Sequence, residues 1–177
     1  MTLRTIVFLT LFLVCGCSTH QRHDWSPGKG GVHAVPGVPF LAQQSNDDCG
    51  PAALASLLAK KGMEIPLEIV TRGVYTPALG GSLLPDMENF ARLQGFATHT
   101  GRGDLELLRR QIDTGRPVII PVDMGVWRVS RPHYLVVFGY DETHFLVHAG
   151  VKGAIFIDAG ELHSRWEKMN GLYLYLE

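Results

Sequence analysis

The sequence has few cysteines, no excess of basic residues and no long apolar run. The 177 residues include three cysteines, Cys15, Cys17 and Cys49. Lys and Arg number 16 against 17 Asp and Glu and are scattered, which argues against a nucleic-acid-binding surface. The apolar run Ile6–Val14, interrupted by Thr10, is too short for a comfortable membrane span. No internal repeat is present, so the length indicates one domain.

The first 17 residues have the features of a signal peptide. Arg4 supplies a positive charge before the apolar run, and a small residue precedes Cys17. This ending resembles a bacterial lipobox, which implies that Cys17 is the lipid-modified first residue of the mature chain. Ser18 is not the aspartate associated with inner-membrane retention, so we expect an outer-membrane lipid anchor facing the periplasm. The alternative is an ordinary secretory signal cut nearby.

The mature chain divides into a tether and a folded domain. Residues 18–35 are rich in Ser, Gly, His, Gln and Pro, which predicts a flexible tether. Residues 36–177 form the predicted domain. With Cys15 removed and Cys17 acylated, Cys49 has no partner for an intramolecular disulfide. A lone thiol in an oxidising compartment is a liability unless it is buried or used.

Cys49 is predicted to lie at the start of a helix. Residues 52–58 are mostly Ala and Leu, Pro51 suits the first turn, and Asp47 or Asp48 can cap it. Unpaired N–H groups at a helix N-terminus favour a thiolate over a thiol, so we expect Cys49 to have a lowered pKa. The alternative is that Cys49 is a small buried apolar residue.

The remaining pattern indicates an α+β fold, with helices first and antiparallel strands later. We expect helices over residues 66–72, 82–94, 104–114 and 161–169. Asp104 and Ser82 are the expected N-caps of two of them. Strands are expected over residues 38–42, 117–122, 133–140, 145–148, 153–157 and 172–176.

Cys49, His133 and Gln43 together suggest a hydrolase. A cysteine at a helix N-terminus facing a histidine from a neighbouring sheet can form a nucleophile–base pair. Gln43 lies six residues before Cys49, where its amide could complete an oxyanion hole with the Cys49 N–H. The alternatives are a core histidine and a loop glutamine, each of which is common.

These residues also carry a family resemblance. Gln43, the string Cys49-Gly-Pro-Ala and the string His133-Tyr-Leu-Val-Val-x-Gly-Tyr resemble the C39 peptidases, also called bacteriocin-processing or double-glycine peptidases. The likeness covers most of the mature chain and is closest to stand-alone lipoprotein members. It implies a papain-like cysteine peptidase fold, with an N-terminal helical half packed on an antiparallel sheet. It also implies Cys49 as nucleophile, His133 as general base and acid, and Gln43 in the oxyanion hole.

One position departs from the family pattern. An aspartate usually follows the histidine by sixteen residues, and here that position is Ala149. His148, Asp123 and Asp158 are candidates for the missing third residue. Whether Ala149 or His148 shares the face of His133 depends on the strand register.

We therefore expect a lipid-anchored cysteine peptidase that cleaves a periplasmic peptide or protein, with activity weakened by the incomplete triad. No cofactor, metal ion or nucleic acid is expected. No ATP is expected either, since the chain is too short for the membrane and ATP-binding domains of the family's transporter members. One alternative is a catalytically silent peptide-binding module. Another is a thiol acyl-transfer enzyme of the cell wall.

Overall fold

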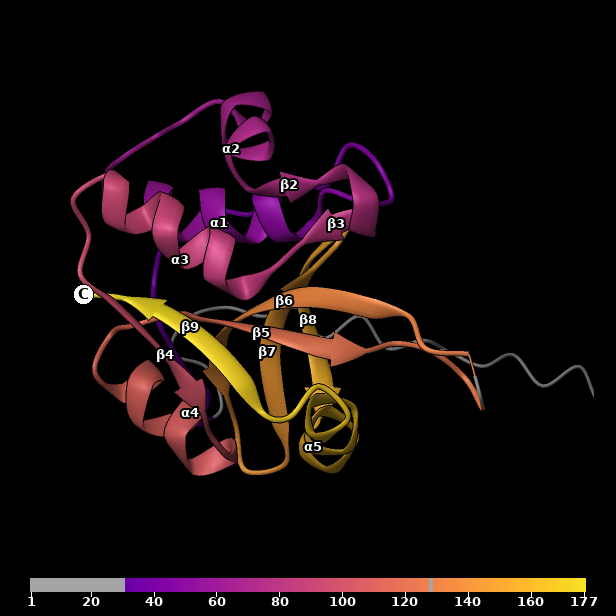
Figure 1. Cartoon of the computed structure of the whole chain (residues 1–177). Helices are drawn as coiled ribbons and strands as arrows, with labels where there is room; N and C mark the ends of the chain where they lie inside the picture. The colour runs from indigo at the N-terminus through magenta and orange to yellow at the C-terminus, as the bar shows by residue number, and fades with distance from the viewer. Residues whose placement is uncertain (1–30, 128) are drawn as a thin grey trace, which may run out of the picture.

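Helices cover both faces of one antiparallel sheet (Figure 1). The structure is a computed structural model that describes residues 31–127 and 129–177. Three helices come first, followed by most of the strands, so the predicted α+β fold with a helical half on a sheet is confirmed. These helices are α1 (Cys49–Lys60), α2 (Leu67–Val74) and α3 (Leu84–Leu93). None of the helices in the described part of the chain is long and apolar enough to cross a bilayer.

The main sheet has the strand order β4-β9-β5-β6-β7-β8, and each neighbouring pair is antiparallel. The last strand therefore lies inside the sheet. A separate small hairpin, β2 (Tyr75–Thr76) and β3 (Gly81–Ser82), follows α2 and encloses the 3-10 turn η1 (Pro77–Leu79). The strands of the main sheet are β4 (Thr98–Arg102), β5 (Val118–Asp123), β6 (Pro132–Tyr140), β7 (His144–Ala149), β8 (Lys152–Asp158) and β9 (Leu172–Leu176).

The central strands are apolar on both faces because both faces are covered. In β5, Ile119 packs among α1, α2 and α3, whereas Ile120 packs on the opposite side. Successive side chains of a strand point to opposite faces, so each face needs its own apolar set. The opposite side is closed by α4 (Leu105–Asp113) and α5 (Ala159–Glu167). This explains why the sequence shows continuous apolar runs there.

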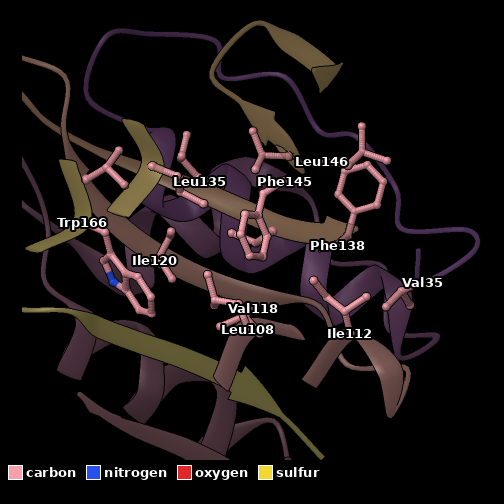
Figure 2. Close-up of a cluster of buried hydrophobic side chains, with 14 residues drawn as sticks. Val35, Leu108, Ile112, Val118, Ile120, Leu135, Phe138, Phe145, Leu146 and Trp166 are labelled. Carbon is pink, nitrogen blue, oxygen red and sulfur yellow. The ribbon is translucent and has the colours of Figure 1, made fainter. Parts of the chain in front are cut away.

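Figure 2 shows the core on the side of α4 and α5. Trp166, on α5, packs against the strands, and its indole N–H donates to the Leu172 carbonyl at the start of β9. A buried indole N–H needs such a partner. The core therefore ties α5 to the strand that follows it. The other labelled members of this core are Val35, Leu108, Ile112, Val118, Ile120, Leu135, Phe138, Phe145 and Leu146.

The local predictions of N-caps and strands were partly right and partly wrong. Asp104 caps α4 as expected, accepting from the Leu107 N–H at 2.8 Å. Ser82 does not cap α3, because it pairs in β3 and Leu83 occupies the cap position. Residues 38–42 are not a strand, and β4 was not predicted at all.

The N-terminal end of the described chain is part of the sheet. β1 (His33–Ala34) pairs with the far end of β6, opposite Tyr140 and Gly139. The His33 ring stacks on Tyr140 with centroids 4.8 Å apart. Residues 33–35 were assigned to the tether, but His33 and Ala34 are ordered by these contacts. The predicted signal peptide, Cys17 and most of the tether lie outside the described residues.

Candidate active site

Cys49 is the first residue of α1, as predicted. The helix is buried from Gly50 to Leu58, so packing fixes it against the sheet and against α2 and α3. The Ala52 N–H donates to the Asp48 carbonyl at 2.9 Å, which starts the helical hydrogen bonds beside the thiol. Cys49 is thus held by a rigid element and lines a cavity.

Asp48 does not cap the helix through its side chain, contrary to expectation. Its carboxylate turns back and accepts from the N–H groups of Gln44 at 3.0 Å and Ser45 at 3.1 Å. Asp48 is buried, so these bonds offset the cost of burying its charge. The side chain therefore shapes the loop that leads from Gln43 to Cys49.

Gln43 is held by backbone contacts on both sides. Its N–H donates to the Gly150 carbonyl at 3.1 Å, and its side-chain Nε2 donates to the Ser45 carbonyl at 2.8 Å. Its Oε1 is buried without a hydrogen-bond partner among the described residues. The amide thus has a local partner for Nε2, while its oxygen lies beside Gly150.

Cys49 and His133 line one cavity, and Gln43 and His133 both lie beside Gly150 at the β7–β8 turn. His133 is the second residue of β6 and lines, with Cys49, a cavity of about 330 Å³. A Cβ placed on Gly150 would lie 2.9 Å from Gln43 Oε1 and 3.4 Å from His133 Cε1. Gly150, in the left-handed region at φ +60°, lets Gln43 and the His133 ring approach the β7–β8 turn.

The thiol is not activated in the way that the sequence predicted. Burial raises the pKa of Cys49, and the charge of Asp48 adds to this rise. The backbone N–H groups of Tyr134, Gly50 and Cys49 act in the opposite direction but do not overcome burial. Burial, with the nearby charge of Arg131, lowers the pKa of His133. At neutral pH Cys49 is therefore a thiol and His133 a neutral imidazole, and both line the same cavity.

The strand register decides which residue shares the face of His133. Leu135 of β6 lies opposite Ala149 of β7, and Val136 lies opposite His148. His133 and Leu135 are two residues apart, so they point to the same face, and Ala149 shares it. His148 is on the other face. The position that carries an aspartate in the family pattern thus lies on the face of His133, opposite Leu135, but offers only a methyl group.

The three other candidates for a third residue are engaged elsewhere. His148 Nδ1 accepts from the Ala154 N–H at 3.0 Å, and Nε2 lies 3.1 Å from the Val38 carbonyl. Asp123 Oδ1 accepts from two N–H groups at 2.8 Å each. Asp158 caps α5 by accepting from the Glu161 N–H. None of these contacts directs a carboxylate or an imidazole at the His133 ring.

Two residues of the site, Tyr134 and Ser82, were not predicted from the sequence. Tyr134 supports the site twice, since its N–H lowers the pKa of Cys49 and its hydroxyl donates to the Ser82 carbonyl at 3.1 Å. The Ser82 Oγ is buried without a partner in the described chain and lines the same cavity. Tyr134 could have been found from its place next to His133 in the sequence. Ser82 could not, because the two-residue strand β3 that contains it has no recognisable sequence pattern. Among residues 31–127 and 129–177, no cluster of His, Cys, Asp or Glu could hold a metal ion.

The helical half, the antiparallel sheet and a cysteine at the N-terminus of the first helix define a papain-like domain. Residues 37–174 match the sequence model of the "Peptidase C39 family", and this match spans well over half of the sequence. The chain therefore belongs to the C39 peptidase family. A comparison with curated proteins gives no significant match.

Solved structures support the fold. The peptidase domain of Streptococcus ComA, a bifunctional ABC transporter of a quorum-sensing pathway, has a TM-score of 0.67 at 24% identity. The alignment covers 78% of this chain and 97% of that one. A C39-like peptidase from Bacillus anthracis has a TM-score of 0.69 at 15% identity, covering 84% and 98%. A double-glycine-motif protease of an AMS/PCAT transporter, solved with a leader peptide, has a TM-score of 0.63 at 22%, covering 81% and 93%.

Proposed function

We propose that this domain is a cysteine peptidase that hydrolyses a peptide bond in a periplasmic peptide or protein. The observation that carries the proposal is the shared cavity of Cys49, at the start of α1, and His133, at the start of β6. Membership of the C39 family supports a peptide as the ligand. The leader peptide bound to the AMS/PCAT protease supports the same class of ligand.

The raised pKa of Cys49 and the lowered pKa of His133 favour proton transfer during attack over a preformed ion pair. In this mechanism neutral His133 takes the thiol proton as Cys49 Sγ bonds to the carbonyl carbon. The imidazolium then protonates the leaving amine as the peptide C–N bond breaks, giving an acyl-enzyme. Water attacks the thioester with His133 as base, the C–S bond breaks, and the thiol regains its proton.

Gln43 is the proposed oxyanion donor, together with the Cys49 N–H. In the structure without substrate, Gln43 Nε2 donates to Ser45, so the amide must exchange this bond for one to the substrate oxygen. Catalytic hydrogen bonds often form only in the complex with substrate. Among the described residues Oε1 has no hydrogen-bond partner, so the present amide position is not fully satisfied, which lowers the free-energy cost of turning the amide.

Peptide cleavage tests the proposal. We expect the purified protein to cut members of a defined peptide library, as detected by mass spectrometry. Cys49→Ala should abolish cleavage, and His133→Gln should reduce it by about a thousandfold or more. His144→Gln is the matched control, since His144 lies at the other end of β7 and should leave cleavage unchanged. Cleavage that survives Cys49→Ala would show that the proposed mechanism is wrong.

A catalytically silent peptide-binding module is the second candidate. Ala149 and the raised pKa of Cys49 favour it, because both reduce activation of the thiol. In that case peptides should be retained on the protein uncut, and Cys49→Ala should bind them as well as the wild type does.

We also propose that the chain is anchored in the bacterial cell envelope through acylated Cys17, with the outer membrane favoured. The apolar run before Cys17 supports this proposal. Cys17→Ser should move the protein out of the membrane fraction, and mass spectrometry should show the loss of acyl chains. Unchanged fractionation after a signal cleavage confirmed by mass would contradict the anchor.

A further inference from the structure

An exposed apolar tip lies between β5 and β6, beside the cavity described above. We call residues 124–127 and 129–131 the finger; Arg128, between them, lies outside the described residues. Its apolar side chains are unusually exposed: 39% for Met124, 75% for Val126, 93% for Trp127 and 68% for Val129. Figure 1 shows this orange loop projecting beyond the sheet at the right. Apolar side chains gathered at one projecting tip mark an interaction surface.

The finger has a defined shape. At its base, Asp123 Oδ1 accepts from the N–H groups of Gly125 and Arg131, each at 2.8 Å. The Met124 N–H donates to the Arg131 carbonyl at 2.9 Å, and Val126 bridges Val129 near the tip. These contacts close the finger as a hairpin.

The backbone of the finger has a particular conformation at Gly125 and Trp127 that few other residues could adopt. A Cβ on Gly125 would lie 1.8 Å from the Val129 carbonyl oxygen, so no other residue fits without a shift. Trp127 adopts φ +55°, which is costly for a bulky side chain. From α5, Arg165 donates to the Asp123 carbonyl and braces the base. The tip is thus held outward at an energetic cost.

The charge of the finger is positive. Residues 124–131 contain Arg128 and Arg131 and no Asp or Glu. The nearest carboxylate, Asp123, is engaged by two N–H groups, which lower its pKa and keep it ionised at the base. An aromatic residue between branched apolar residues and arginines matches the interface of an anionic bilayer, where Trp and Arg are both favoured.

We propose that the finger inserts Val126, Trp127 and Val129 into the surface of an anionic lipid bilayer. A protein partner is less well matched, because a stable interface needs about 800 Å² per partner. Four side chains at a convex tip offer much less, since even a tryptophan buries only about 250 Å². Lipid headgroups need no matching surface, and the arginines supply attraction to them.

Insertion of the finger would orient the cavity. Pro132 and His133 directly follow Arg131, so the bound finger places the His133 end of β6 at the bilayer. β1 joins β6 at the opposite end, roughly 27 Å away at about 3.3 Å per residue. The membrane contact stands on the finger alone and does not depend on the proposed peptidase activity.

Tryptophan fluorescence of the full chain on vesicles tests this proposal. The vesicles contain phosphatidylethanolamine and phosphatidylglycerol, with and without brominated acyl chains, which quench only fluorophores in the bilayer. The contribution of Trp127 is the difference between the wild type and Trp127→Phe, since the other two tryptophans are common to both. We expect Trp127 to be quenched by the brominated lipid and shielded from acrylamide. Vesicles of phosphatidylcholine alone should reduce the quenching severalfold.

A second exposed site provides the matched control. Leu93, on α3, is 83% exposed, and Leu93→Trp in the Trp127→Phe chain places a tryptophan away from the finger. We expect this tryptophan to remain open to acrylamide and unquenched by the brominated lipid. Equal quenching at both sites, or a Trp127 that stays open to acrylamide on vesicles, would overturn the membrane contact. If Trp127 stays open to acrylamide on vesicles, a protein would remain as the binding partner of the finger.

Discussion

Position 149 shows how one methyl group changes the chemistry of the site. Ala149 shares the face of His133, yet no carboxylate there stabilises an imidazolium. Burial then dominates, raising the pKa of Cys49 and lowering that of His133. The neutral thiol–imidazole pair follows from this combination, because burial disfavours the charged form of both groups.

Restoring the carboxylate should reverse this effect. We expect Ala149→Asp to raise the pKa of His133 and to favour the thiolate of Cys49. Alkylation of Cys49 by iodoacetamide, followed across pH, should have its midpoint above the free-thiol pKa of about 8.5 in the wild type and at lower pH in the variant. Ala149→Asn is the control for size and polarity. Equal midpoints in the three proteins would show that position 149 does not influence His133.

The residues of the site differ in how far the sequence could predict them. Cys49, His133 and Gln43 have characteristic spacing; in the structure Cys49 and His133 line one cavity, and Gln43 lies with His133 beside Gly150. The role of Asp48 could not be predicted, because an Asp before a helix can cap it or turn back onto the preceding loop. The sign of the pKa shift at Cys49 depends on burial by distant segments such as β6, which a helix pattern does not show.

Among the elements, prediction succeeded where the local pattern was strong. β5, β6 and β9 have apolar residues that suit strands, and α1 is rich in Ala and Leu. β4, with the sequence Thr-His-Thr-Gly-Arg, has no such signal and is a strand because β9 pairs along its whole length. The hairpin of β2 and β3 has two residues per strand, too few for a periodicity.

At the scale of the whole molecule, one buried and one half-buried histidine make stability depend on pH. Burial lowers the pKa of both His133 and His148 below 6.5, so the folded state favours their neutral forms. A lowered pKa contributes stability that is fully present above the unfolded value and is lost as pH falls through the folded value. Protonation of His148 Nδ1 would also remove the acceptor of the Ala154 N–H. The domain should therefore weaken in mild acid.

Urea unfolding at pH 7.5 and 5.0 measures this effect. The free energy of unfolding of the wild type should fall, with each histidine contributing at most about 1.4 kcal/mol per pH unit. His148→Asn keeps a hydrogen-bonding side chain but removes the titrating group, so its stability should fall less between the two pH values. Lower stability at both pH values is expected for the variant and does not affect the test. An equal fall in both proteins would contradict the role of His148.

The internal place of β9 has a consequence for the order in which the chain can assemble. Residues 172–176 are the last strand in sequence, yet they separate β4 from β5 in the sheet. During synthesis β4 has no partner until these residues emerge, so the sheet closes late and through contacts that are distant in sequence. The proposed export requires a chain that is still unfolded when it meets the membrane. Late arrival of β9 provides that delay.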